Sequence, residues 1–191
     1  MKEIEIIPSS ITSNWREYFQ TVKDDTVLYA PGIGPCIAGL FYRKGHLGLG
    51  HFDPMMDSVL EDISHIVKKE MEKEGTGNIG CRLFTGVSFA AREEFQRDKG
   101  IAMYHRYIRE INNLGFNFNE RGSRTYILAN NGPALLIGKI QAKLTGKDLE
   151  KVEVRIEYMR RDQKETVEEF EIDIENDQTR VIQAFTEEKL Y

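Results

Sequence analysis

The sequence predicts an α+β fold in which mixed or antiparallel sheets pack with two or three helices, and in which the C-terminal half is rich in β structure. Apolar residues recur at helical spacing in three segments, 13–23, 53–75 and 101–114. Short apolar or alternating runs, typical of strands, lie between these segments. After Gly115 the chain contains only strand-like runs separated by polar turns, which indicates an antiparallel meander.

Each predicted element has its own start and stop signals. Ser13 can cap the first helix, Asp53-Pro54 is a strong start for the second, and Gly75 ends it. Residues 88–99 are compatible with a loop or with a helical turn. We expect strands at residues 3–7, 26–29, 37–42, 47–52, 78–84, 116–118, 124–128, 134–143, 152–159, 166–174 and 179–185.

Composition narrows the classes of function. The chain has 191 residues, about 40% of them apolar, and a formal net charge of −5. This length fits a single domain, and the acidic residues are spread without a basic stripe, so we expect no nucleic-acid partner. The N-terminus has no apolar signal segment, and the longest apolar run, 37–42, is far too short for a membrane span. We therefore expect a cytoplasmic protein with no membrane association.

Cys36 and His51 form the one credible chemical site. They flank a predicted β-hairpin whose turn lies within residues 43–46. With Arg43-Lys44 as the turn, Cys36 faces His51 directly; with Lys44-Gly45, it faces Asp53, and His51 is its diagonal neighbour on the same face. The Cβ atoms of such pairs lie about 5 Å or about 7 Å apart, so both registers bring a thiol near an imidazole.

This pairing matters because only a thiolate attacks, and a free thiol has a pKa of roughly 8.5. A neighbouring imidazolium lowers the pKa of the thiol, and the histidine can then give a proton to a leaving amine. Gly32 and Gly34, in the loop before the cysteine, allow the backbone N–H groups to point at an oxyanion. Pro35 has no N–H, so the donors would be Cys36 itself and the glycines before it.

Structural explanations compete with this interpretation. A lone cysteine that opens an apolar strand is usually a small core residue, and a strand histidine usually serves packing. We expect Cys81 to be a core residue, and His46, His65 and His105 to be solvated. A metal site would need a recognised ligand spacing, which Cys36, His46 and His51 do not have, and the chain has no C-x-x-C motif. We predict neither a metal nor another cofactor.

The segment around the pair resembles the chemoreceptor glutamine deamidases (CheD) and the catalytic domain of the cytotoxic necrotising factor toxins. The resemblance rests on Gly32-Ile33-Gly34-Pro35-Cys36, the apolar strand 37–42 and Gly48-Leu49-Gly50-His51. It extends more loosely over residues 26–135. It implies a sandwich fold with a core at about 26–144 and cofactor-independent hydrolysis of a protein glutamine side chain. The β-rich extension at about 145–191, which we place in the same single domain 1–191, has no counterpart in the family.

Two positions depart from the family. The family has a threonine six positions before the cysteine, where this chain has Ala30. The family also has a serine directly before the cysteine, where this chain has Pro35. The group that orients His51 must therefore come from elsewhere. Asp53 is a local candidate, although it is better placed as a helix N-cap; in the toxin relatives, backbone carbonyls take this role.

Two functions follow. The first is a cysteine amidohydrolase of the protein-glutamine deamidase type, with Cys36 and His51 catalytic, Gly32 and Gly34 in the oxyanion loop, and a protein as substrate. The alternative is a non-catalytic binding or assembly protein that keeps the CheD-like fold. In that case the acidic, β-rich tail at 165–189 offers an interaction surface or an edge for a homodimer.

Overall fold

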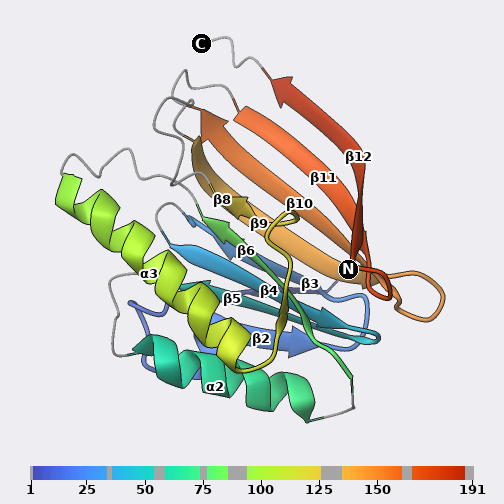
Figure 1. The fold of residues 1–191 in the computed structure, drawn as a ribbon. Helices are drawn as coiled ribbons and strands as arrows, with labels where there is room; N and C mark the ends of the chain where they lie inside the picture. Colours follow the sequence, from blue (N-terminus) through green and yellow to red (C-terminus); the bar gives the residue numbers. More distant parts are fainter. Residues whose placement is uncertain are drawn as a thin grey trace.

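The computed structural model describes residues 2–33, 36–53, 59–73, 77–85, 94–125, 135–160 and 165–187. Two six-stranded sheets face each other, and helices cover the side of the second sheet that points away from the first (Figure 1). The expected α+β class with its excess of β structure is confirmed.

The first sheet joins the two ends of the chain. Its strand order is β1-β3-β9-β10-β11-β12, and β1 is parallel to β3 while the other neighbours are antiparallel. The C-terminal meander therefore continues a sheet that the N-terminal strands begin, because β9 pairs with β3. The strands are β1 (Glu3–Glu5), β3 (Val27–Pro31), β9 (Leu135–Thr145), β10 (Lys151–Arg160), β11 (Glu165–Asp173) and β12 (Gln178–Glu187).

The second sheet has the order β2-β5-β4-β6-β7, with β8 also paired to β6. Its central hairpin, β4 and β5, lies between β2 and β6, and all three of these contacts are antiparallel. The strands are β2 (Phe19–Val22), β4 (Ile37–Arg43), β5 (His46–Phe52), β6 (Gly80–Thr85), β7 (Asn117–Phe118) and β8 (Arg124–Thr125).

Three helices accompany the sheets: α1 (Trp15–Tyr18), α2 (Val59–Glu72) and α3 (Glu94–Asn113). The prediction of a helix over 13–23 was wrong. The side chain of Asn14, not Ser13, caps a single turn, after which Phe19–Val22 pairs with β5 as a strand. Tertiary pairing thus overrides the helical spacing of the apolar residues. Within the ranges given above, no helix combines the length and apolar character needed to cross a membrane.

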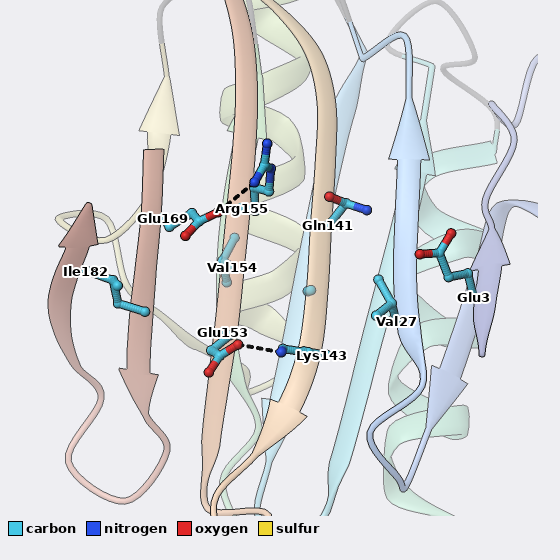
Figure 2. Close-up of a pocket in the computed structure, with 10 residues that line it drawn as sticks. Glu3, Val27, Gln141, Lys143, Glu153, Val154, Arg155, Glu169 and Ile182 are labelled. Carbon is cyan, nitrogen blue, oxygen red and sulfur yellow. Dashed lines mark hydrogen bonds and ion pairs between the residues drawn. The ribbon is translucent and has the colours of Figure 1, made fainter. Parts of the chain in front are cut away.

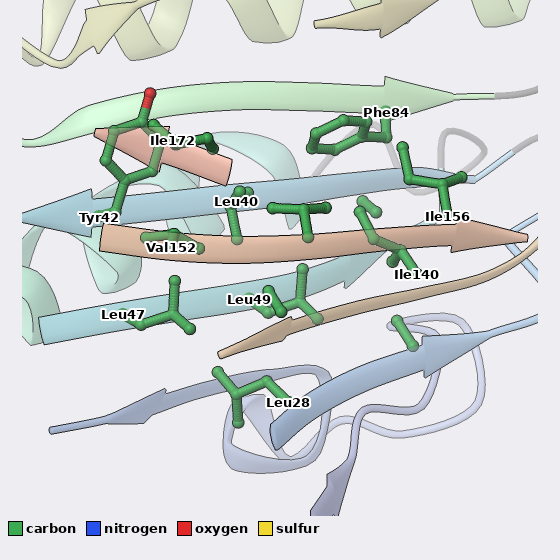
Figure 3. Packing of buried hydrophobic residues seen from close by; sticks show 14 of the residues in the cluster. Leu28, Leu40, Tyr42, Leu47, Leu49, Phe84, Ile140, Val152, Ile156 and Ile172 are labelled. Carbon is green, nitrogen blue, oxygen red and sulfur yellow. The ribbon is translucent and has the colours of Figure 1, made fainter. Parts of the chain in front are cut away.

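Two apolar cores hold these layers together. The larger lies between the sheets, where Leu40, Leu49 and Phe84 of the second sheet meet Ile140 and Ile156 of the first (Figure 3). The smaller lies between the second sheet and the helices and is rich in aromatic rings. Burying one side chain of this size contributes roughly 1.5–3 kcal/mol, so the two faces of the central hairpin are both strongly fixed.

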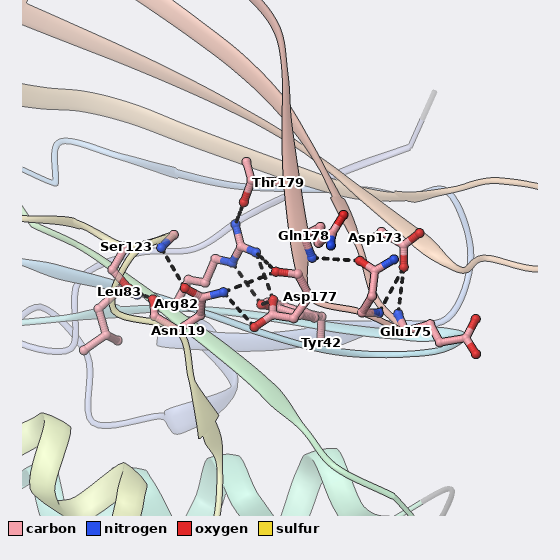
Figure 4. A network of polar contacts seen from close by, with 12 residues as sticks. Tyr42, Arg82, Leu83, Asn119, Ser123, Asp173, Glu175, Asp177, Gln178 and Thr179 are labelled. Carbon is pink, nitrogen blue, oxygen red and sulfur yellow. Dashed lines mark hydrogen bonds and ion pairs between the residues drawn. The ribbon is translucent and has the colours of Figure 1, made fainter.

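A buried polar network ties the C-terminal hairpin to the second sheet. Arg82 of β6 is fully buried, and its Nη2 lies 2.9 Å from Oδ1 of Asp177 in the β11–β12 turn (Figure 4). Arg82 also donates to the hydroxyls of Tyr42 at 2.9 Å and Thr179 at 2.5 Å. Asn119 Nδ2 donates to Asp177 Oδ2 at 2.8 Å. These bonds supply the partners that a buried guanidinium needs.

Candidate active site

The β4–β5 hairpin fixes the relation between Cys36 and His51. It turns through Lys44 and Gly45, and Ala38 lies opposite His51. This is the second of the two registers considered above. The ladder ends at Ile37 opposite Phe52, and Cys36 lies in a bend just before it. If the same register were continued by one residue, it would set Cys36 across from Asp53, with His51 diagonal to Cys36. In a regular ladder such diagonal Cβ atoms lie roughly 7–8 Å apart.

His51 is fully buried and is anchored at one ring nitrogen only. Its Nδ1 lies 3.4 Å from the carbonyl oxygen of Ile6. Because a carbonyl only accepts, this contact places the proton of the neutral imidazole on Nδ1. Nε2 has no hydrogen-bond partner among the described residues. The imidazole therefore presents a lone pair to the interior, which is the form that a general base needs.

Cys36 is also nearly buried, with 8% of its surface exposed. Burial and, to a smaller extent, the charge of Asp53 raise the pKa of its thiol to about 12. Burial lowers the pKa of His51, and the Ile6 carbonyl and Asp53 only partly offset this effect. Both shifts favour the uncharged form, so the pair rests as a neutral thiol and a neutral imidazole. Within the described part of the chain, no hydrogen bond joins the sulfur to Nε2 in this resting state.

Asp53 lies at the end of β5 and acts on both groups through its charge. Its backbone N–H donates to the hydroxyl of Ser9 at 2.9 Å. The Nδ1 of His51 contacts the main chain of Ile6, so the position that we considered for Asp53 as an orienting group is taken by a carbonyl. Residue 54, where the helix after Asp53 was expected to begin, lies outside the described residues.

The amides of Gly32 and Cys36 already have acceptors within the protein. Gly32 adopts a φ of +62°, which favours glycine, and its N–H donates to the carbonyl of Gly138 at 2.5 Å. The N–H of Cys36 donates to the carbonyl of Ile33 at 2.6 Å. Two of the three amides considered as oxyanion donors, those of Gly32 and Cys36, are therefore engaged in this state. Gly34 and Pro35 lie outside the described residues.

Ala30, at the position of the family's threonine, is fully buried between the sheets. The segment after β1 lies beside it, because the N–H of Ile6 donates to the carbonyl of Tyr29 at 2.9 Å. The same Ile6 residue offers its own carbonyl to His51. Sequence reasoning missed both Ile6 and Ser9, since a main-chain acceptor and an isolated serine leave no local pattern in the sequence.

The other candidates fall into two groups. Cys81 is fully buried, and His65 and His105 are exposed, as expected. The prediction that His46 is solvated was wrong, because only 5% of it is exposed. It lies at the end of the hairpin that packs against α2, and burial, followed by the charges of Lys23 and Arg43, lowers its pKa.

A hollow with a volume of about 320 Å³ lies elsewhere, on the outer face of the first sheet (Figure 2). Four of its five charged side chains form two ion pairs: Lys143 pairs with Glu153 at 2.7 Å, and Arg155 pairs with Glu169 at 2.7 Å, while Glu3 is the fifth. It contains neither Cys36 nor His51. Most of the charges in this hollow are therefore already paired within the sheet.

Neither the known family models nor the curated proteins contain a match to this chain. The candidate site therefore rests on the geometry described above.

Proposed function

We propose that the protein is a cofactor-independent cysteine amidohydrolase of the protein-glutamine deamidase type. The observation that carries the proposal is the state of His51: buried, anchored through Nδ1 to the Ile6 carbonyl, and without a partner at Nε2 among the described residues. A buried polar atom without a partner costs free energy, so its persistence favours a functional use. The hairpin register makes Cys36 the nearest candidate to use it.

The reaction begins from the neutral pair. His51 Nε2 takes the thiol proton as the sulfur of Cys36 attacks the side-chain amide carbon, which gives a tetrahedral oxyanion. His51 then returns that proton to the amide nitrogen, and ammonia leaves a thioester. Water attacks the thioester and gives a proton to His51, and the departing sulfur takes the proton back. One amide and one water become one carboxylic acid and one ammonia.

The pKa values in the resting state favour a site whose thiol is unreactive until a substrate binds. With the pKa of Cys36 at about 12, on the order of one thiol in 10⁵ is ionised at about pH 7. Proton transfer to His51 must therefore accompany the attack instead of preceding it. The engaged amides of Gly32 and Cys36 fit the same picture, because an oxyanion would have to replace the carbonyls of Gly138 and Ile33 as their acceptor.

The test is ammonia release and glutamine-to-glutamate conversion in a panel of folded and unfolded proteins incubated with the purified chain. Cys36→Ser and His51→Asn should each abolish the conversion. His65→Asn, on the exposed face of α2, is the matched control and should keep full activity. Conversion that persists in Cys36→Ser would refute the proposal.

Alkylation by iodoacetamide gives a second test that needs no substrate. Cys36 should react faster than the fully buried Cys81, and His51→Asn should slow the reaction at Cys36 alone. An alkylation rate of Cys36 that is the same in the wild type and in His51→Asn would favour a protein that binds without catalysis.

A binding or assembly role remains the second candidate, and β12 favours it. This strand ends the first sheet, and its side chains from residue 178 to 184 are exposed. Val181 and Ile182 are 56% and 49% exposed, which is unusual for an edge strand that avoids pairing. Pairing of β12 with a second copy should appear as a dimer in analytical ultracentrifugation. Val181→Lys combined with Ile182→Lys should return the chain to a monomer.

A further inference from the structure

The segment that follows β1 bridges the two sheets next to the candidate site. The N–H of Ile6 donates to Tyr29 of the first sheet, and its carbonyl accepts from His51 of the second. Ile6 itself is fully buried. Residues 6–9 therefore determine what the imidazole of His51 contacts on its Nδ1 side.

Ser9 holds the end of β5 from two sides. Its N–H donates to the carbonyl of His51 at 3.0 Å, and its hydroxyl accepts from the N–H of Asp53 at 2.9 Å. The pairing of β2 with β5 reaches only to Phe19 opposite Gly50. Ser9 takes the next place along this edge, with its side-chain oxygen where a strand would offer a carbonyl.

The two bonds bracket the residues that matter for the chemistry. His51 and Asp53 flank Phe52. The side chains of His51 and Phe52 are fully buried on opposite faces of the sheet, and the two bonds to Ser9 hold the edge of this tripeptide. Only 2% of Ser9 is exposed, so water cannot readily replace its hydroxyl. Without the hydroxyl, the end of β5 would lose one of its two edge bonds just where the imidazole must keep its direction.

We propose that Ser9 is a positioning residue for His51: it fixes the end of β5 so that Nε2 stays directed away from the Ile6 carbonyl and available to the thiol. The proposal rests on the function proposed above. It assigns to the N-terminal segment the orienting role that the family gives to a threonine and that Ala30 cannot perform.

The test compares Ser9→Ala with Ser10→Ala in the full chain, because Ser10 is adjacent and exposed. The titration of the His51 ring is followed by NMR and assigned with His51→Asn. The alkylation of Cys36 is followed against pH. Ser9→Ala should move the His51 titration towards the usual histidine range, because a looser strand end admits water, and should slow Cys36 alkylation about tenfold. Ser10→Ala should match the wild type in both measurements.

Ser9→Thr keeps the hydroxyl and should retain the wild-type titration of His51. Ser9→Val has the shape of the threonine variant without the hydroxyl and should behave like Ser9→Ala. This pair decides the question even if Ser9→Ala does not fold. Wild-type titration in Ser9→Val, or a shifted titration in Ser9→Thr, would overturn the positioning role. If the alkylation rate of Cys36 is the same in the wild type and in His51→Asn, the proposed function is refuted instead. The titration of the His51 ring would still report on the role of Ser9.

Discussion

Nδ1 of His51 lies 3.4 Å from the carbonyl oxygen of Ile6, a residue 45 positions earlier in the chain. The contact fixes the proton of the neutral imidazole on Nδ1, and burial keeps the second proton off by lowering the pKa. Folding thus holds His51 neutral at a pH at which the unfolded chain would protonate it. The same holds for His46, whose pKa burial also lowers.

This difference predicts acid sensitivity. Below about pH 6.5 the unfolded state binds more protons than the folded state, so the free energy of unfolding should fall as the pH drops from about 6.5 to about 5. Each histidine contributes at most about 1.4 kcal/mol per pH unit. Urea unfolding at a series of pH values measures the slope. His51→Asn should lose about half of it, and a flat profile in the wild-type chain would contradict the buried neutral state of both rings.

Ala30→Thr tests whether a threonine at this position, which the deamidases that the sequence resembles contain, would act on the site. Ala30 is fully buried in the core between the sheets, and its neighbourhood already contains Ile6 and Ile140. The larger side chain should destabilise the protein by about 1–3 kcal/mol, because the core must shift to accept it. It should not accelerate alkylation of Cys36, since the Ile6 carbonyl already anchors His51. Faster alkylation would show that the site lacks the threonine.

The hairpin could be predicted from sequence because its signals are local. Continuous apolar runs on both sides of a short polar turn indicate two paired strands, and Gly45, with a φ of +70°, fits the turn between them. The choice between two registers could not be made locally, because both kept Cys36 and His51 on one face. The structure selected the one that sets Cys36 across from Asp53.

What sequence reasoning missed depends on distant contacts. Phe19–Val22 has helical spacing, yet it pairs with β5, which lies more than twenty residues later. His46 was expected in solvent because it adjoins a turn, but α2 packs against this end of the hairpin and buries it. Ile6 acts through its carbonyl, which any residue type could supply, so no choice of side chain could reveal it.

Gly50→Ala tests whether the glycines of the motif serve packing. A Cβ at Gly50 would overlap the ring of Phe52, which is fully buried and cannot move aside freely. We expect a loss of about 1–3 kcal/mol in the free energy of unfolding, measured by urea denaturation. Gly138→Ala is the control, because the nearest atom to its Cβ would be the carbonyl oxygen of Glu157 at an ordinary 3.6 Å. Equal stability of the two variants would mean that Gly50 has another role.

The Arg82–Asp177 pair predicts an asymmetric response to mutation. Arg82 is fully buried, whereas the side chain of Asp177 is 18% exposed. Asp177→Asn leaves a buried guanidinium without its counter-charge and should cost about 3–5 kcal/mol. Arg82→Met keeps the apolar stem and leaves a carboxylate that water and Asn119 can still reach, so its cost should be smaller. In urea denaturation, the double variant should lose less free energy of unfolding than the two single variants lose together. The reason is that the second change removes the charge that the first change leaves without a partner. Strict additivity would show that the two side chains act independently, and that the β11–β12 turn is held to the second sheet by its other hydrogen bonds.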